Sequence, residues 1–301
     1  MEDLTMYAVP AFIGLILLEL GLSVFTTGVR GYEWRDTFAS LAMGVGNRVI
    51  YAAVGGAILA FQFVLYQHRL FDLGTSWWVW VLCFFAEDFT YYWFHRGSHE
   101  VRFLWAAHVN HHSSERYNLS TALRQSWTTP FTTALFYWPL PLLGFHPVMI
   151  LTCTAVSLFY QFWIHTELIE RMGRFERAFN TPSHHRVHHG ANVEYLDRNH
   201  GGILILWDRL FRTFEPERAA VRYGLTKNIH TFNPWKIAFH EWQALARDVR
   251  AAANWRDALG YIFMPPGWSP DGSTLTSEQL RALAAGGQGP EARDWGLGVR
   301  G

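Results

Sequence analysis

Long apolar runs dominate the first half of this 301-residue chain and limit the folds open to it. About 20 helical residues cross a hydrocarbon core of about 30 Å, and four runs approach or exceed that length: residues 9–25, 49–66, 77–94 and 131–164. Only 17% of the residues are charged, against about 25% in soluble domains. We therefore predict an all-α fold, an integral membrane helical bundle of about four to five membrane helices.

The fourth apolar run is too long for a single crossing. Pro139 and Pro141, followed by glycine and proline at 144–147, predict that it forms a helical hairpin. Glu19 lies inside the first run and needs either a partner or a position at the membrane interface. After His165 the chain becomes polar, which predicts a cap lying at the membrane surface.

Histidine is the most unevenly distributed residue of the sequence. Ten of the 15 histidines fall in three short stretches. These stretches contain His95 and His99; His108, His111 and His112; and His184, His185, His188, His189 and His200. Burying so many imidazoles is costly unless hydrogen bonds or metals satisfy them, so the clustering indicates a metal site.

The spacing within the stretches suits metal ligands carried on helices. Residues i and i+4 of a helix lie on one face, so His95 and His99 can reach the same ion. The pattern His-x-x-His-His occurs twice, at 108–112 and 185–189. With His95 and His99, these two patterns supply more imidazoles than one metal needs, so we predict a dimetal site. Imidazole suits Fe, Zn, Cu and Ni, and the spacing does not choose among them.

Several further residues are candidates for the site or its surroundings. His165 directly follows the fourth apolar run and is a candidate ninth ligand. His184 and His200 can be extra ligands, or they can contact the ligands without contacting the metal. Carboxylates often orient ligating imidazoles through the second ring nitrogen; the candidates here are Glu87, Asp88, Glu115 and Asp208. Salt bridges to nearby arginines are the alternative for these four.

Other common classes of protein are not supported. The sequence has no His-Glu-x-x-His zinc-peptidase motif, no Cys-x-x-Cys-His haem motif, and no Gly-rich phosphate or dinucleotide motif. Its formal net charge is zero, so no long-range field attracts nucleic acid. Cys83 and Cys153 lie in apolar runs and are expected to be buried free thiols.

At its histidine groups the sequence resembles the fatty acid hydroxylase / sterol desaturase superfamily. The resemblance lies in Tyr-Tyr-Trp-Phe-His-Arg at 91–96, Trp-Ala-Ala-His-Val-Asn-His-His-Ser-Ser-Glu at 105–115, Tyr-Asn-Leu-Ser-Thr-Ala-Leu-Arg-Gln-Ser at 117–126, Asn-Thr-Pro-Ser-His-His-Arg-Val-His-His-Gly at 180–190 and Gly-Gly-Ile-Leu-Ile-Leu-Trp-Asp-Arg-Leu-Phe at 201–211. Residues 161–167, 223–226 and 233–234 are similar to the alkylglycerol monooxygenase branch. At His200, relatives often carry tyrosine.

The resemblance implies a membrane-bound di-iron oxygenase that hydroxylates a lipid with O2. Its metal ligands would be His95, His99, His108, His111, His112, His185, His188 and His189, with His165 as the ninth. The lipid would be a fatty acyl, ether-lipid, sterol or aminolipid molecule drawn from the bilayer. The two electrons would come from tetrahydrobiopterin, as in the alkylglycerol branch, or from a redox partner protein of the cytochrome b5 or ferredoxin type.

Two alternatives stay open at this point. A lipid or sterol desaturase would use the same di-iron centre. A non-catalytic, metal-stabilised scaffold or transporter belongs to another class, although a transporter should carry polar residues near the centres of several spans. The histidines here lie at the ends of the apolar runs and in the polar half, which disfavours a transporter.

The resemblance and the apolar runs together predict three segments. Residues 1–70 would form N-terminal membrane helices, residues 71–240 a fatty acid hydroxylase-type catalytic domain, and residues 241–301 a helical segment with a disordered tail. Arginines are frequent in 96–124 and 171–212, and positively charged segments tend to face the cytoplasm. We therefore predict a multi-pass protein of a bacterial inner membrane or endoplasmic reticulum type, with the metal site in a cytosolic helical cap.

Overall fold

The computed structural model describes residues 4–25 and 31–286. Within them the structure is helical, and the pairing of extended backbone is limited to two isolated bridges, Phe179 with Leu204 and Gly190 with Tyr223. The all-α prediction is confirmed for the described part of the chain.

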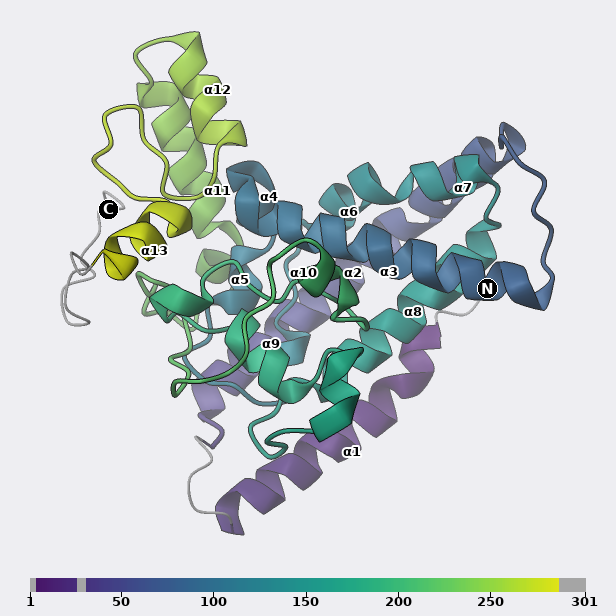
Figure 1. Ribbon diagram of the computed structural model, residues 1–301, viewed down its shortest axis with the longest axis horizontal. Coiled ribbons are helices and arrows are strands. Elements are labelled where there is room, and N and C mark those ends of the chain that lie inside the picture. The colour runs from purple at the N-terminus through teal and green to yellow at the C-terminus, as the bar shows by residue number, and fades with distance from the viewer. Residues whose placement is uncertain (1–3, 26–30, 287–301) are drawn as a thin grey trace.

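Four long helices form the body of the molecule: α1 (Leu4–Phe25), α2 (Trp34–Gln67), α3 (Trp77–Glu100) and α8 (Pro147–Trp163). Helix α8 packs against the other three. Most of the short helices gather at the end of the bundle where α3 finishes (Figure 1). This end carries all three histidine stretches, and we call it the cap.

The fourth apolar run forms the predicted hairpin. Its first arm contains α6 (Thr129–Tyr137) and α7 (Pro139–Leu143), and its second arm is α8. Gly144 ends α7 with a φ of +107°, in the left-handed region that favours glycine. The backbone N–H of Val148 donates to Nδ1 of His146 at 3.2 Å, so this histidine caps the start of α8.

Helix α2 is the one described helix that is long and apolar enough to cross a membrane, judged by length and composition. Its outer face is apolar and exposed, as Phe38 (63%), Val45 (65%) and Val49 (62%) illustrate. The apolar segment Pro10–Phe25 and α8 are shorter. The count of four to five membrane helices therefore stays a prediction.

Glu19 has the partners that its apolar surroundings require. Its carboxylate accepts hydrogen bonds from the hydroxyl groups of Tyr32 and Thr166 and from the backbone N–H of Leu119. Thr166 directly follows His165, and Leu119 lies shortly after the second histidine stretch. Glu19 thus attaches α1 to the cap.

The cap consists of one longer helix and a set of short elements from several parts of the chain. They are α4 (Arg102–Ala106), α5 (Val109–His112), η1 (Thr121–Leu123), η2 (Gly173–Arg177), α9 (Pro182–His188), η3 (Val193–Tyr195), α10 (Leu206–Leu210), α11 (Pro234–Ala251), α12 (Trp255–Phe263) and α13 (Ser277–Ala285). The predicted boundary at residue 240 falls inside α11. Helices α12 and α13 lie in the predicted C-terminal segment, and Thr276 and Gln279 form a capping box at the start of α13. Residues 287–301, the rest of the predicted tail, lie outside the described residues.

Candidate metal centre

Helix α3 delivers the first two histidines of the site. His95 and His99 lie one turn apart at its C-terminal end, and both are buried. Their ring centroids are 5.4 Å apart. The i, i+4 spacing therefore brings both rings to one place, as the sequence predicted.

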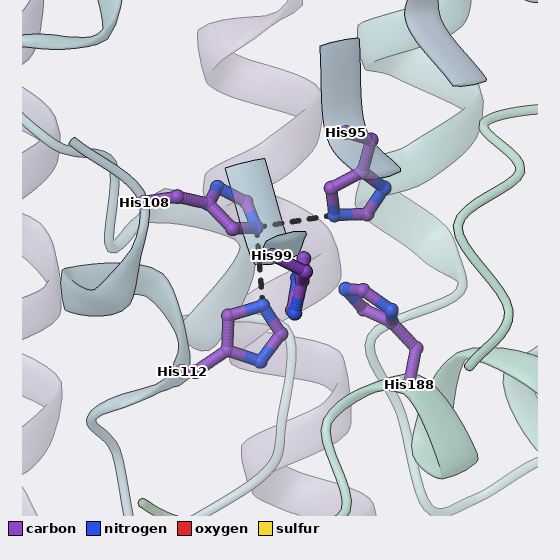
Figure 2. A group of neighbouring side chains, drawn as sticks. All are labelled: His95, His99, His108, His112 and His188. Atoms are coloured by element: carbon purple, nitrogen blue, oxygen red, sulfur yellow. Dashed lines mark hydrogen bonds between the residues drawn. The ribbon is translucent and has the colours of Figure 1, made fainter. Parts of the chain in front are cut away.

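The nine histidines predicted as ligands converge in two groups. The five-histidine group contains His95, His99, His108, His112 and His188. The four-histidine group contains His111, His165, His185 and His189. Within each group the ligand nitrogens all lie within 4.8 Å of one another. Figure 2 shows the five rings of the first group converging on a common centre.

The two groups are adjacent because each His-x-x-His-His pattern contributes to both. In the first pattern His112 belongs to the five-histidine group, whereas His111 belongs to the other. In the second pattern His188 and His189 divide in the same way. Neighbouring residues on a helix point in different directions, so one short helix can serve two centres. The rings of His112 and His189 stack across the boundary at 4.4 Å.

Backbone carbonyl groups orient four of the imidazoles by accepting a hydrogen bond from Nδ1. Nδ1 of His95 donates to the carbonyl of His200 at 2.8 Å, and Nδ1 of His188 donates to that of Arg198 at 2.9 Å. In the four-histidine group, the carbonyls of Gln161 and Arg124 accept from His165 (2.7 Å) and His111 (3.3 Å). Such hydrogen bonds fix the tautomer and turn Nε2 toward the metal position.

His111 and His165 meet in a way that calls for a cation. A carbonyl only accepts, so Nδ1 of each ring carries the proton and Nε2 of the neutral ring carries a lone pair. The two Nε2 atoms are 3.2 Å apart. Burial and neighbouring imidazoles lower the pKa of His111 well below its usual 6.5, and burial lowers the pKa of His165 to about 4. Two lone pairs therefore face each other, and a metal ion between them would remove the repulsion.

The donor set of the five-histidine group also fits a metal. Burial and the neighbouring imidazoles lower the pKa values of His108, His112 and His188 well below 6.5, which favours the neutral ligand form. Nε2 of His108 is 3.1 Å from Nε2 of both His95 and His112. An ion with metal–nitrogen bonds of about 2.1 Å holds nitrogens at right angles about 3.0 Å apart. Buried Nε2 atoms of His99, His188 and His189 have no hydrogen-bond partner among the described residues.

A cavity of about 930 Å³ lies within the cap and borders both groups of histidines. His99, His112 and His188 of the five-histidine group line it, together with His189 of the four-histidine group. Its other lining residues include aromatic or apolar side chains, such as Trp105 and Trp268, and charged side chains of both signs, such as Arg247 and Asp271. A molecule with both a polar and an apolar part can therefore approach the histidines here.

None of the four carboxylates proposed from the sequence contacts an imidazole of either group. Glu87 accepts from the hydroxyl of Tyr137, and the exposed Glu115 lies 3.5 Å from His230. Asp88 accepts from the backbone N–H groups of Ile203 and Leu204 and from the indole of Trp207. Asp208 accepts from the backbone N–H groups of His200 and Gly201 at 2.7 Å. Asp88 and Asp208 therefore position the backbone of this segment rather than an imidazole nitrogen of either group.

The carboxylate that does approach the site is Asp197, which sequence reasoning missed. Its Oδ1 lies 3.5 Å from Nδ1 of His99. Asp197 and Asn199 both have positive φ values, +52° and +57°, so the local turn could not be read from periodicity. The carbonyl groups behind His95 and His188 come from this same turn, at His200 and Arg198. Any residue has a carbonyl, so no sequence signal marks these two.

His184 and His200 lie outside both groups but differ in position. His184 packs its ring against Phe214 at 5.3 Å. His200 is fully buried, and its ring centroid is 5.1 Å from that of His99. Only His200 therefore borders a metal position.

Comparison with known proteins agrees with this arrangement. The sequence model of the fatty acid hydroxylase family matches residues 80–213, which include every histidine of the two groups. Alkylglycerol monooxygenase of Homo sapiens is 43% identical over 272 residues, which cover 89% of this chain and 60% of that protein. The Danio rerio alkylglycerol monooxygenase is 44% identical over 266 residues, covering 87% of this chain and 59% of that protein.

A more distant relative carries a different name. Ornithine lipid hydroxylase OlsE of Rhizobium tropici is 33% identical over 152 residues, which cover 50% of this chain and 46% of that protein. The chain spans about three fifths of the length of the vertebrate alkylglycerol monooxygenases that it matches. No solved structure matches the chain.

Proposed function

The chain belongs to the fatty acid hydroxylase family, and from this premise we propose that it is a membrane-bound di-iron lipid monooxygenase. The observation that carries the proposal is the convergence of nine buried or half-buried histidines into two adjacent groups of neutral nitrogen donors. A scaffold metal would need one closed site of about four ligands. Two adjoining groups with a cavity beside them favour chemistry on a bound molecule.

Two irons would be held by the two groups, one by each. When bound, the iron pair would supply the activation of O2 with two electrons from a donor. The chain itself keeps the imidazoles neutral by burial, orients them through the carbonyls of Arg124, Gln161, Arg198 and His200, and limits access of water. Exclusion of water protects a reactive centre from side reactions.

The substrate that we propose is an ether lipid of the alkylglycerol kind. The name of the human and zebrafish relatives supports this choice, as does their identity of more than 40%. The cavity beside the histidines has both aromatic and charged walls, so an amphiphile can place its apolar part against Trp105 and its polar end against the charged side chains. Positioning of one carbon near the centre would determine which bond reacts. An aminolipid is the second candidate because of the likeness to OlsE.

The electron donor that we propose is tetrahydrobiopterin, on the basis of the alkylglycerol branch. A redox protein of the cytochrome b5 or ferredoxin type is the alternative. Each donor can be supplied to the purified protein with an alkylglycerol and O2, and product can be measured by mass spectrometry. Turnover with the pterin alone supports the first, and turnover only with a redox protein supports the second.

The first experiment is metal analysis of the purified protein by mass spectrometry, with Mössbauer spectroscopy after iron-57 enrichment. We expect about two irons per chain with an exchange-coupled pair, and an oxidised lipid product that is lost in the His111→Ala and His188→Ala variants. His68→Ala is the matched control because His68 is exposed at the other end of α2. A hydroxylated product supports the hydroxylase, whereas a new double bond would make the protein a desaturase. One zinc or no metal in folded protein would instead favour the scaffold.

A further inference from the structure

His200 is a buried imidazole that the proposed chemistry has not used. None of its surface is exposed, and neither ring nitrogen makes a hydrogen bond of good geometry among the described residues, although the backbone of Asp197 lies near the ring. A buried polar group without a partner destabilises the folded protein, because it has lost its hydrogen bonds to water. An imidazole placed in this way calls for a ligand that is not part of the protein chain.

The spacing of His200 matches that of the five-histidine group. Its ring centroid lies 5.1 Å from that of His99 and 5.7 Å from those of His95 and His188. Within the group, ring centroids are separated by 4.3 Å for His95 and His188 and by 5.4 Å for His95 and His99. His200 therefore borders the same centre at nearly the distances that its members keep.

The backbone holds the ring of His200 in this position. The N–H of His200 donates to Asp208 at 2.7 Å, and its carbonyl accepts from Nδ1 of His95 at 2.8 Å. The preceding Asn199 has a φ of +57°, and its side chain donates to the carbonyls of His184 and Glu215. These contacts fix the backbone on both sides of the His200 side chain.

We propose that His200 is a sixth imidazole ligand of the five-histidine group, an inference that rests on the proposed di-iron function. The ring of His200 lies beside the rings of His95, His99 and His188. The ligand nitrogens of these three histidines lie within 4.8 Å of one another. Six imidazoles would then surround one iron and four the other. The two irons would be inequivalent, with exogenous ligands having more room at the four-histidine group.

The test compares His200→Gln and His200→Phe with the control His184→Gln, all loaded with iron-57. His184 is a suitable control because it is also buried and close in sequence to ligands, yet it packs against Phe214. We expect two Mössbauer doublets of equal area in the unchanged protein. The His200 variants should alter one doublet only and release one of their two irons to a chelator at least about tenfold faster. His184→Gln should leave both doublets and both release rates unchanged.

The possible results separate this inference from the proposed function. If both His200 variants keep the two doublets and the release rates of the unchanged protein, His200 is not a ligand. If the unchanged protein binds fewer than two irons, the proposed function is wrong, and this inference falls with it. If neither variant folds, His200→Tyr replaces them, because relatives often carry tyrosine at this position: a new tyrosinate-to-iron charge-transfer absorption supports the inference, and unchanged absorption with unchanged doublets overturns it.

Discussion

Single residues that contact Nδ1 of an imidazole determine how firmly the ring is held in its orientation. His99 has the side chain of Asp197 behind it, with Oδ1 3.5 Å from Nδ1. Groups behind a ligating histidine typically change metal affinity by about 10–100-fold. We predict that Asp197→Asn lowers the affinity for one metal by about tenfold, because the neutral amide attracts the Nδ1–H of His99 less strongly. Competition with a chelator, followed by metal analysis, measures the change.

Glu115→Gln is the control for this prediction. Glu115 was a candidate from the sequence, whereas Asp197 was not, but the side chain of Glu115 is exposed and pairs with His230 away from the two groups. Its variant should retain metal like the unchanged protein. Equal metal retention by Asp197→Asn and Glu115→Gln would mean that Asp197 does not orient His99.

At this scale the sequence predicts which histidines converge better than it predicts the groups around them. The i, i+3 and i+4 spacings identified eight of the nine converging histidines, and His165 was recognised by its place after an apolar run. The division into five and four, in which His111 and His112 separate, depends on how α5 is oriented in the fold. The supporting carbonyls and Asp197 carry no pattern in sequence, because a turn with positive φ brings them in.

At the scale of elements, a buried ion pair joins α2 to the site. Arg124 is 1% exposed, and its guanidinium forms a salt bridge with Asp36 in the first turn of α2. It also donates to the hydroxyls of Ser40 and Ser113 at 3.1 Å. The carbonyl of the same Arg124 accepts from His111. The ion pair therefore links the position of α2 to the orientation of one imidazole.

We predict that Arg124→Met lowers the free energy of unfolding by about 3–5 kcal/mol, because it leaves the Asp36 carboxylate buried without its partner. The double variant Arg124→Met/Asp36→Leu should recover much of this loss. Unfolding of the detergent-solubilised variants, measured by circular dichroism, provides the comparison. A loss below about 1 kcal/mol in the single variant would contradict a coupled buried pair.

The hairpin of α7 and α8 depends on one glycine. A Cβ on Gly144 would lie 2.2 Å from the carbonyl oxygen of Phe71, and its φ of +107° is unfavourable for other residues. We predict that Gly144→Ala lowers the free energy of unfolding by at least about 1–3 kcal/mol. Gly55→Ala is the control: Gly55 lies within α2 with open space around it, and alanine there should be neutral or stabilising. Equal unfolding midpoints for the two variants would show that the turn tolerates a side chain.

At the scale of the whole molecule, the two ends of the bundle differ in chemistry. One end carries the connection between α2 and α3, where the backbone N–H of Leu70 bonds to the carbonyl of Leu142 at the end of α7. The opposite end is the cap (Figure 1). The connection 68–76 contains one arginine, Arg69, which pairs with Asp72 at 2.9 Å. The segments 96–124 and 171–212, at the cap end, contain four and seven arginines.

This asymmetry leads to a prediction of orientation. Positively charged segments near membrane helices tend to stay in the cytoplasm, so we expect the cap and its histidines to be cytoplasmic. Two single-cysteine positions test this: Ser76→Cys on the α2–α3 connection and Ala282→Cys on α13, both exposed. The native Cys83 and Cys153 are buried, which keeps background labelling low.

A membrane-impermeant maleimide applied to intact cells should then label Ser76→Cys, and Ala282→Cys should react only after the membrane is permeabilised. The opposite pattern would place the cap outside the cytoplasm, where a cytosolic reductant could not reach it, and would require a different electron donor. Equal labelling of both positions in intact cells would mean that the bundle does not separate its two ends across a membrane. The cavity that borders the histidines lies within the cap. The side of the membrane that the cap faces therefore also determines which electron donors can reach the histidines.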